Sequence, residues 1–484
     1  RGLGDVYKRQ LREKIRVLWD GLKENCNDMK QIYLIGISCI LLGILLSSCK
    51  LGKEYVRPEL NLPADFEKGQ TIDSVSVSEL KWWDLYTDTV LQGLIRKALL
   101  YNKDMQMAVA RIKETEASKR IAKADLFPKV DIKVSGQRDY DYTPENIFEA
   151  KGLLSWEIDL WGKLRWGNQA AIAEYLQSVE GQRALQMTII AQVAQAYFEL
   201  SALDEELKIV RQTLEARKEG VHLAKLRYEG GMTSETSLRQ AQVELARTAT
   251  LVPDLERKIH LKENDISLLT GQYPGQIGRG EGILKQNLPR TLPTGLPSTL
   301  LERRPDIREA EFKLKAAHAK AGLQYTSLFP KIPLSAQYGL ENNQWEGFFQ
   351  SPFFFLGGQI LAPLFNMGKN RAQLKAARAV AEREGYAYEK VVLTAFKEVN
   401  DALVSSRKIE AIRESRDSLE EAARSYLELA NLQYINGVIG YIDVLDAQRG
   451  YFDAQIGLNN AVRDELIAIV NLYKVLGGGW EPQE

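Results

Sequence analysis

The chain has 484 residues, of which 45% are hydrophobic, and its 64 basic and 64 acidic side chains leave no net charge. This length allows roughly two to four domains. The balanced charge argues against a nucleic-acid-binding protein, which needs a basic surface.

The first segment that has the pattern of a protein start is 29–48. Residues 1–28 are charged and lack an initiating Met, so we interpret them as a non-native upstream segment before a true start at Met29. Lys30 then gives a short positive end, and 32–46 is almost wholly apolar. This pattern describes a secretory signal peptide. The apolar run is shorter than the ~20 residues of a comfortable membrane-spanning helix.

The signal ends in Leu46-Ser-Ser-Cys49, which resembles a bacterial lipobox with Cys49 as the first, lipid-modified residue of the mature chain. The alternative is a plain signal peptide with an incidental cysteine. Cys26 and Cys39 lie before this point, so the mature chain keeps one cysteine and no internal disulfide framework. One acylated cysteine anchors a chain to a membrane surface without spanning it. By resemblance to well-studied lipoproteins, the following Lys50 fits sorting to the outer membrane.

The chain contains an internal duplication. The matching pairs are YEGGMTSETSLRQAQ (228–242) with YINGVIGYIDVLDAQ (434–448), LFPK (126–129) with LFPK (328–331), and Gly162-Lys163 with Gly368-Lys369. We therefore divide the mature chain into a first repeat over 49–270, a Pro- and Gly-rich linker over 271–297 and a second repeat over 298–484.

Each repeat has the order helix, strand, strand, long helix, Gly turn, long helix. We expect β-hairpins over about 129–161 and 331–365. Helical hairpins are expected over about 164–270 and 368–476.

Short stretches of alternating apolar and polar residues predict the strands. The alternation is clear over 130–142 and 154–161 and weaker over 332–340 and 354–364. It fits a membrane β-barrel, but the strands alone favour the alternative, a half-buried sheet of a soluble protein. Aromatic residues crowd both ends of the strands, like the interfacial belts of membrane proteins, and favour the membrane. They are Tyr140, Tyr142, Trp345, Phe348, Phe349, Phe353, Phe354 and Phe355 at one end, and Phe127, Trp161, Trp166 and Phe329 at the other.

Apolar residues recur at alternating spacings of three and four through 200–228, 238–269 and 444–461. This pattern predicts coiled-coil packing. The seam also contains Ala, Thr, Tyr and charged residues, Arg217 and Lys262 among them, which favours many helices side by side over a two-stranded zipper. A spectrin-like soluble rod is the alternative, but such a rod has no strand hairpin in each repeat.

Two strands per repeat make four per chain. A membrane barrel must pair every strand edge, and about eight strands is the practical minimum, so four are too few. If these strands span a membrane, the chain must form an oligomer. Three copies would supply twelve strands and a helical tunnel.

Several motifs, in this order and spacing, resemble the TolC-like outer membrane efflux proteins, especially the lipidated branch typified by OprM and NodT. They are LSSC (46–49), LFPK (126–129 and 328–331), WEIDLWGK (156–163), LERRPDI (301–307), PLFNMGKNR (363–371) and YINGVIGYIDVLDAQ (434–448). Together they cover the chain from Met29 onwards.

The resemblance implies a mainly α fold with membrane β strands. Each chain would be a tandem-repeat protomer of a homotrimer, in which a 12-stranded outer-membrane β-barrel (4 strands per chain) continues into a long periplasmic α-helical barrel. The chain ends and the linker would form an equatorial belt. The trimer would be the passive exit duct of a tripartite efflux pump for drugs, metals or other small molecules. Its partners would be a periplasmic adaptor and an inner-membrane transporter, of RND type.

Two alternatives stay open. The same architecture serves as the duct of one-step (type I) protein secretion, and a lipid-anchored periplasmic coiled-coil scaffold is a rival of another class. A duct for metals is weakened by the six Met residues, which are scattered.

Little in the sequence suggests an enzyme. His222, His260 and His318 belong to no metal-binding motif. The Gly-rich stretch at 278–282 follows no strand, and Gly368-Lys369 lacks the upstream Gly of a phosphate loop. We expect no catalytic residue, no metal and no cofactor other than a lipid on Cys49.

The hairpin tips are candidate docking surfaces. They comprise Gly230, Gly231, Met232 and Thr233 in the first repeat, and Asn436, Gly437, Val438 and Ile439 in the second. Gly permits the backbone conformation that ends a helix, and exposed apolar residues beside it suggest a docking surface. The resemblance implies that the adaptor's hairpins meet these tips; the alternative is an ordinary turn between helices.

Asp443 and Asp446 lie three residues apart, on one helical face. The resemblance implies that they ring a constricted periplasmic entrance, where three copies would supply six carboxylates and favour cations. It also implies that Tyr434 helps hold the entrance shut. The first repeat has Ser237 and Gln240 at the equivalent places, so only the second hairpin would supply charge. Without the resemblance, two solvated surface aspartates would be the better interpretation.

Overall fold

A computed structural model describes residues 50–63, 80–140, 145–286, 288–289 and 297–480. The predicted signal peptide and Cys49 lie outside the described residues. The chain divides into two compact units. Unit 1 comprises the chain up to Val56, Lys119–Ala171 and Ala317–Val380, and unit 2 comprises Arg57–Ser118, Ile172–Ala316 and the chain from Ala381. Among the described helices, none combines the length and the apolar character needed to cross a membrane.

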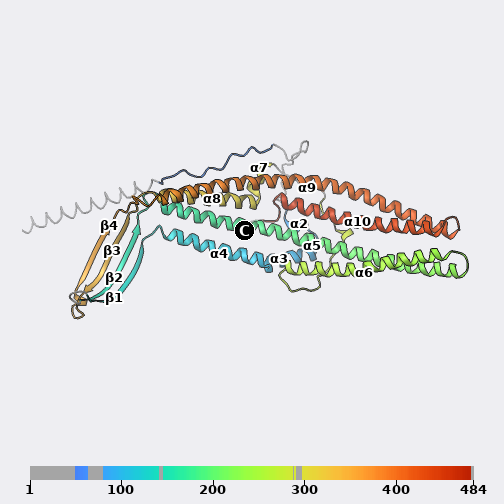
Figure 1. Cartoon of the computed structure of the whole chain (residues 1–484), viewed down its shortest axis with the longest axis horizontal. Helices are drawn as coiled ribbons and strands as arrows, with labels where there is room; N and C mark the ends of the chain where they lie inside the picture. Colours follow the sequence, from blue (N-terminus) through green and yellow to red (C-terminus); the bar gives the residue numbers. More distant parts are fainter. Residues whose placement is uncertain (1–49, 64–79, 141–144, 287, 290–296, 481–484) are drawn as a thin grey trace, which may run out of the picture. The chain divides into compact units, whose positions relative to one another are not determined.

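Unit 1 contains one antiparallel sheet with the strand order β1-β2-β3-β4 (Figure 1). The strands are β1 (Lys129–Asp139), β2 (Glu145–Glu157), β3 (Pro333–Asn342) and β4 (Pro352–Gly358), with a short 3-10 turn η3 (Phe348–Gln350) between the last two. Strand β2 of the first repeat pairs with β3 of the second, from Phe148 opposite Asn342 to Glu157 opposite Pro333. Each repeat thus contributes one hairpin to a shared sheet, in which β1 and β4 are the described edges.

Two strands, β2 and β4, have bounds that differ from the sequence-based expectation. The second strand starts well before the expected 154–161 and ends earlier, at Glu157. It ends there because Asp159 accepts hydrogen bonds from the backbone N–H groups of Leu164 and Arg165, at 3.0 and 2.9 Å, in the first turn of the next helix. The fourth strand spans 352–358, not the expected 354–364.

The two faces of the sheet differ in character. One face is apolar and exposed: Ile132 is 84% exposed and Leu356 is 70% exposed. Its other members include Val130, Val134, Leu154, Trp156, Tyr338 and Phe354. On the opposite face the Glu149 carboxylate lies 2.8 Å from Lys133 Nζ and 3.0 Å from Lys151 Nζ. A half-buried sheet of a soluble protein would cover its apolar face. In this sheet the apolar face is exposed, and the polar face contains the ion pairs of Glu149.

Trp166, 1% exposed, is the centre of a small core in unit 1. It packs against Ala170 and against residues of the neighbouring helix, Ala319 and Leu323. Its indole N–H donates to the Leu51 carbonyl at 2.8 Å, and the Lys50 ammonium lies 3.3 Å from the centre of its ring. The first described residues are therefore held against the helix ends of unit 1.

The helices repeat in length as well as in order. They are α2 (Trp82–Leu85), α3 (Thr89–Tyr101), α4 (Lys103–Ala124), α5 (Lys163–Glu229), α6 (Glu235–Leu269), α7 (Pro297–Arg303), α8 (Pro305–Thr326), α9 (Lys369–Ile435) and α10 (Tyr441–Val475), with a short turn η2 (Ile283–Lys285). Helices α4 and α8 have 22 residues each, α5 and α9 have 67 each, and α6 and α10 have 35 each. At 1.5 Å per residue the longest helices extend ~100 Å. The three longest helices of the first repeat thus have counterparts of equal length in the second.

The two helical hairpins, α5/α6 and α9/α10, pack through the expected seam within unit 2 (Figure 1). Val210, Ala224 and Leu255 are among the seam residues that are nearly inaccessible to solvent. The first hairpin contacts the second, for example where Asn459 Nδ2 donates to the Ala202 carbonyl at 2.9 Å. Small seam residues such as Ala224 allow the helices to approach each other closely.

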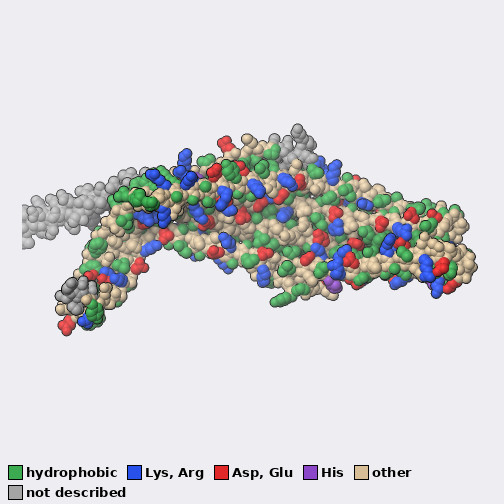
Figure 2. Space-filling model, in the orientation of Figure 1, with side chains coloured by type: hydrophobic (Ala, Val, Ile, Leu, Met, Phe, Trp, Pro, Cys, Tyr) green, Lys and Arg blue, Asp and Glu red, His purple; other side chains and the backbone are tan. Residues whose placement is uncertain are grey.

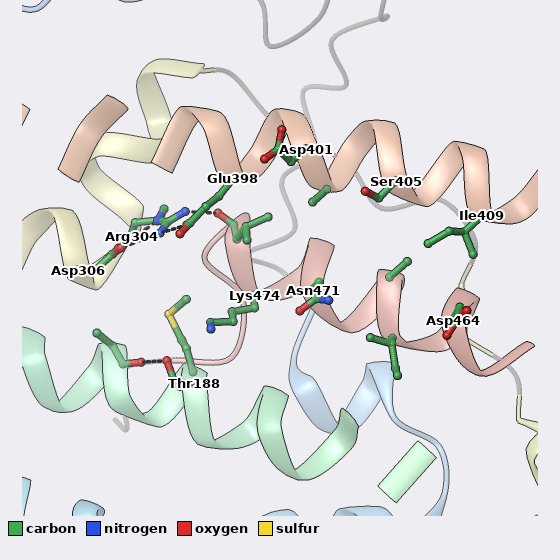
Figure 3. Close-up of a pocket in the computed structure, with 16 residues that line it drawn as sticks. Thr188, Arg304, Asp306, Glu398, Asp401, Ser405, Ile409, Asp464, Asn471 and Lys474 are labelled. Carbon is green, nitrogen blue, oxygen red and sulfur yellow. Dashed lines mark hydrogen bonds and ion pairs between the residues drawn. The ribbon is translucent and has the colours of Figure 1, made fainter. Parts of the chain in front are cut away.

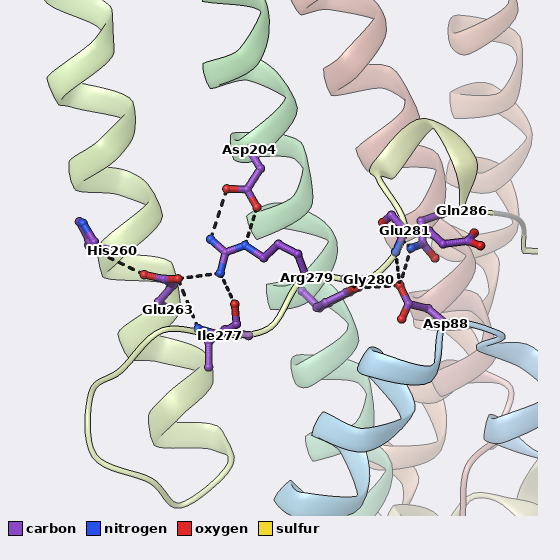
Figure 4. Close-up of polar contacts among 10 residues, drawn as sticks. Asp88, Asp204, His260, Glu263, Ile277, Arg279, Gly280, Glu281 and Gln286 are labelled. Atoms are coloured by element: carbon purple, nitrogen blue, oxygen red, sulfur yellow. Dashed lines mark hydrogen bonds and ion pairs between the residues drawn. The ribbon is translucent and has the colours of Figure 1, made fainter.

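Polar contacts fasten the first part of the linker, 271–286, to the helices of unit 2 (Figure 4). Arg279 pairs with Asp204 of α5 at 2.7 Å and with Glu263 of α6 at 2.6 Å. Asp88, before α3, accepts hydrogen bonds from Tyr197 and Gln286, each at 2.7 Å. Burial acts to raise the pKa of Asp88, but these and backbone hydrogen bonds outweigh it and lower the pKa. These contacts therefore hold this part of the linker against the helices of unit 2.

Candidate functional site

Both hairpin tips end their first helix with the same hydrogen-bond pattern. Gly231 and Gly437 have φ values of 69° and 72°, in the left-handed region that favours glycine. The residue after each glycine donates its N–H to a carbonyl of the last helical turn, at 2.8 Å from Met232 and 2.9 Å from Val438. This is the pattern of a Schellman motif. The conformation of the turn therefore explains why both repeats carry this glycine.

Apolar side chains surround both tips. Met232 is 76% exposed and Val438 is 70% exposed, whereas Ile439 is half-buried. Two further residues of the second tip, Ile435 and Ile442, are 70% and 58% exposed. The second tip therefore carries the larger apolar surface, and a docking role for both tips stays a prediction.

Asp443 and Asp446 are both exposed on the first turns of α10, while Val444 and Leu445 between them are buried. Val444 and Leu445 thus face the neighbouring helices, whereas the two carboxylates face solvent. Asp443 also accepts a hydrogen bond from the Gly440 N–H at 3.0 Å, which satisfies a free donor at the helix start. Among the described residues, neither aspartate forms an ion pair.

Tyr434 lies between the two helical hairpins. The Arg227 guanidinium, near the end of α5, lies 4.3 Å from the centre of its ring. The ring is also 5.5 Å from that of Tyr441, which packs against a buried cluster of α5 and α6 residues: Ala224, Leu238 and Ala241. Tyr434 is thus in contact with both hairpins, which agrees with the predicted role without testing it.

A buried carboxylate links three helices close to these residues. The Glu244 side chain on α6 is 3% exposed, and it lies 2.7 Å from Arg449 of α10 and 3.1 Å from Arg217 of α5. The pKa of Glu244 is lowered overall. Burial acts to raise it, but the hydrogen bond from Arg449 and the charges of both arginines outweigh that effect. Arg217 also donates to the Thr248 hydroxyl. The carboxylate therefore ties the helix that carries Asp443 to the first hairpin.

This cluster is absent from the sites predicted from the sequence, although one signal was present. Arg217 occupies a seam position, where a charged residue needs a partner. Its partners Glu244 and Thr248 lie on α6, and Arg449, which shares Glu244, lies on α10. Seam spacing alone does not show which helices face each other.

A cavity of about 670 Å³ lies within unit 2, where the end of α10 meets the start of α8 (Figure 3). Arg304 donates to the Val475 carbonyl at 3.2 Å and pairs with Asp306 at 2.6 Å and with Glu398 at 2.7 Å. Burial acts to lower the pKa of Arg304, but both carboxylates outweigh it and raise the pKa. Because Arg304 is paired with two carboxylates of this wall and with the end of α10, we interpret this region as a structural contact between helices.

The described residues contain no group of His, Cys, Asp and Glu side chains that could hold a metal ion. His222 is exposed on α5, and His260 forms a hydrogen bond with Glu263 at 3.1 Å. His318 lies edge-on to Trp166 in unit 1, where burial lowers its pKa. Each histidine thus has a surface or packing role in its own helix.

The sheet, the paired helical hairpins and the duplicated tips agree with one known family. Residues 94–272 and 296–478, one stretch in each repeat, match the family model described as outer membrane efflux protein. The chain belongs to the outer membrane efflux protein family. The prediction of this family from the sequence is confirmed.

Individual relatives in this family match over nearly the whole chain. The toluene efflux pump outer membrane protein TtgC of Pseudomonas putida is 32% identical over 467 residues, covering 92% of this chain and 96% of that protein. The probable outer membrane lipoprotein SilC of Salmonella typhimurium is 29% identical over 464 residues, covering 93% and 100%. The solved structure of the outer-membrane channel OprN superposes with a TM-score of 0.84 at 28% identity, covering 90% and 100%.

These matches confirm the predicted fold class: a mainly helical tandem-repeat protomer with a four-stranded sheet, of the kind found in TolC-like outer-membrane channels. The protein is an outer-membrane efflux channel with a long periplasmic extension. As a member of this channel family it is a passive conduit and not an enzyme.

Proposed function

We propose that this efflux channel works as a homotrimer that forms the exit duct of a tripartite pump. The strongest support is the four-stranded sheet, which has two open edges and an exposed apolar face. A barrel in a membrane must pair every edge, and four strands are too few to do so. Pairing β4 of one copy with β1 of the next closes the ring with twelve strands.

The pump would also contain a periplasmic adaptor and an inner-membrane transporter of RND type. The adaptor would dock on the two tips defined above, Gly230–Thr233 and Asn436–Ile439. Exposed Met232 and Val438 support this role, because apolar side chains at a helical tip favour contact with another protein.

Small molecules are the proposed cargo. TtgC is named for toluene efflux, and this relationship favours the export of drugs, metals or other small molecules over one-step protein secretion. The transporter and the adaptor would choose the compound.

The second hairpin of each copy would supply the periplasmic gate. Asp443 and Asp446 are exposed and unpaired among the described residues, so their charge is available to ions near the entrance. Tyr434, held between the hairpins, would help to keep the entrance closed.

Planar-bilayer recordings test this proposal. The purified wild-type trimer should conduct, and Asp443→Asn with Asp446→Asn should raise the single-channel conductance and weaken the preference for cations. Asn can still accept the hydrogen bond from Gly440, so this pair removes charge and retains the helix start. Asp443→Ala with Asp446→Ala should show the same direction of change.

Ser237→Ala with Gln240→Ala provides the matched control, because these residues occupy the same places in the first repeat. It should leave conductance and selectivity unchanged. If the aspartate variants also behave like the wild type, the gate assignment is wrong. If the protein is released from membranes as a monomer and never conducts, it is a lipid-anchored scaffold.

We further propose that Cys49 carries the lipid anchor, since SilC is named a lipoprotein and the lipobox ends at this residue. Cys49→Ser should abolish incorporation of labelled fatty acid, while the trimer persists as a heat-modifiable band. Label that remains on the variant would show that another residue is acylated.

A further inference from the structure

The start of α9 carries an unusual concentration of unpaired positive charge. Lys369, Arg371, Lys375 and Arg378, the α9 basic cluster, are all exposed. In the described part of the chain none of the four forms an ion pair. The sequence has no acidic residue between Glu346 and Glu382, so the chain near them offers no counter-charge. Figure 2 shows basic and hydrophobic side chains mixed on the visible face in this region.

The first repeat shows the same turn with its charges neutralised. Gly162 and Gly368 both have left-handed φ values, 82° and 78°, and each is followed by Lys, one other residue and Arg. In the first repeat Lys163 pairs with Glu157 at 3.3 Å, and Arg165 pairs with Asp159 at 3.2 Å. The Gly-Lys-x-Arg turn can therefore fold with both cations satisfied inside the chain.

The second repeat lacks these partners. Pro363 and Phe365 stand where the first repeat has its two acids, and Phe365 is 83% exposed. The second repeat also has two further cations, since Lys375 and Arg378 correspond to Gln169 and Ile172 of the first repeat. The two repeats thus differ at this turn: its cations are paired in the first repeat and unpaired, among the described residues, in the second.

The α9 basic cluster lies next to exposed apolar side chains at the end of a membrane strand. Between the end of β4 and the start of α9, five apolar residues are more than half exposed: Ile360 72%, Leu361 51%, Leu364 95%, Phe365 83% and Met367 86%. Apolar side chains followed by Lys and Arg are typical of the boundary between hydrocarbon and headgroups. The helix that follows extends into the periplasm.

We propose that the α9 basic cluster binds the phosphate groups of anionic phospholipids in the periplasmic leaflet of the outer membrane. Basic residues at a membrane surface attract anionic lipids. Arg guanidinium can hold a phosphate through two hydrogen bonds, and Lys adds a mobile point charge. The exposed apolar residues from Ile360 to Met367 would contact the acyl chains of the same lipids.

A neighbouring copy is a poor source of counter-charge. In the proposed trimer, antiparallel pairing places the start of β1 of the next copy beside the end of β4. The chain leading into β1, 119–129, has four basic residues and one acidic residue, Asp125, which pairs with Lys129 at 2.9 Å. The acidic residue of this segment is therefore already paired within its own chain. This step depends on the proposed homotrimer.

Lipid selectivity at the protein surface tests the proposal. Purified full-length protein is reconstituted into phosphatidylethanolamine vesicles, and the immobilised fractions of spin-labelled phosphatidylglycerol and phosphatidylcholine are compared. The wild type should prefer phosphatidylglycerol by on the order of fivefold at low salt. Lys369→Gln, Arg371→Gln, Lys375→Gln and Arg378→Gln together should abolish the preference, and high salt should weaken it in the wild type.

Two further variants keep the test decisive. Lys285→Gln, Lys390→Gln, Lys408→Gln and Arg416→Gln together remove the same charge from exposed positions of unit 2 and should retain the preference. Lys375→Gln with Arg378→Gln leaves the Gly368 turn intact and should lose part of the preference even if the quadruple variant does not fold.

Conductance of each variant in planar bilayers separates this proposal from the proposed function. A conducting α9 variant that still prefers phosphatidylglycerol overturns the lipid proposal and leaves the duct intact. A variant whose trimer dissociates in detergent with unchanged lipid preference also overturns it, and shows instead that the cluster contacts the next copy.

Discussion

At the scale of single residues, two helical glycines show how packing can outweigh helix propensity. A Cβ atom added at Gly322 of α8 would lie 2.5 Å from the Trp166 ring, which is 1% exposed. A Cβ atom added at Gly385 of α9 would meet no atom within 4 Å. Gly in a helix interior costs about 1 kcal/mol relative to Ala, so the two glycines should respond differently to the same substitution.

Gly385→Ala should raise the melting temperature of the purified trimer, because it removes that propensity cost without a clash. Gly322→Ala should lower it, since overpacking of a filled core costs about 1–3 kcal/mol. Circular dichroism during heating measures both. A stabilised Gly322→Ala variant would show that Trp166 moves easily, and would contradict the rigid core inferred for unit 1.

At the scale of elements, the buried Glu244 carboxylate holds the two helical hairpins together. Glu244→Gln should lower the free energy of unfolding by about 3 kcal/mol, because Arg217 then stays buried without a charged partner. Denaturant titration of the detergent-solubilised trimer, followed by circular dichroism, measures the change.

Glu256→Gln is the matched control for this change. Glu256 joins α6 to α5 through Arg211 at 2.8 Å, but both side chains are largely exposed. An exposed pair contributes at most about 1 kcal/mol, so this variant should differ little from the wild type. Equal effects of the two substitutions would mean that the Glu244 cluster adds nothing beyond a surface ion pair.

At the scale of the whole molecule, the two faces of the sheet should tolerate charge differently. Ile132→Lys places an ammonium group on the apolar face that is expected to meet lipid, at a cost of about 2–4 kcal/mol per copy near the middle of the membrane. The heat-modifiable trimer in outer-membrane fractions should therefore decrease. Gln337→Lys, on the opposite face of the same sheet, should assemble normally.

Gel electrophoresis of heated and unheated membrane fractions distinguishes the two variants. Normal assembly of Ile132→Lys together with failure of Gln337→Lys would reverse the assignment of the faces. Failure of both would indicate that the sheet tolerates no added charge, and the faces would then need another test.

Local patterns in the sequence were sufficient to predict the elements. The seam spacing predicted the helical hairpins, and the repeated Gly231 and Gly437 predicted where their turns lie. Strand alternation predicted two β-hairpins but misplaced β2, because Ala150 and Gly152 are small and weaken the contrast between its faces. Asp159 accepts hydrogen bonds from the first turn of α5, and β2 ends before it. The sequence does not show these hydrogen bonds, so it does not predict the end of β2.

The sequence by itself determined the duplication, the element order, the number of strands in each chain and the family, because periodicity, motif spacing and strand number are properties of the chain. Only the tertiary structure decided that Glu244 joins Arg217 to Arg449 and that Arg304 connects the start of α8 to α10. It also decided that the cations after Gly368 are unpaired among the described residues, whereas those after Gly162 are paired. These contacts join residues far apart in the sequence. Their partners depend on which helix faces are brought together, and seam spacing does not specify that.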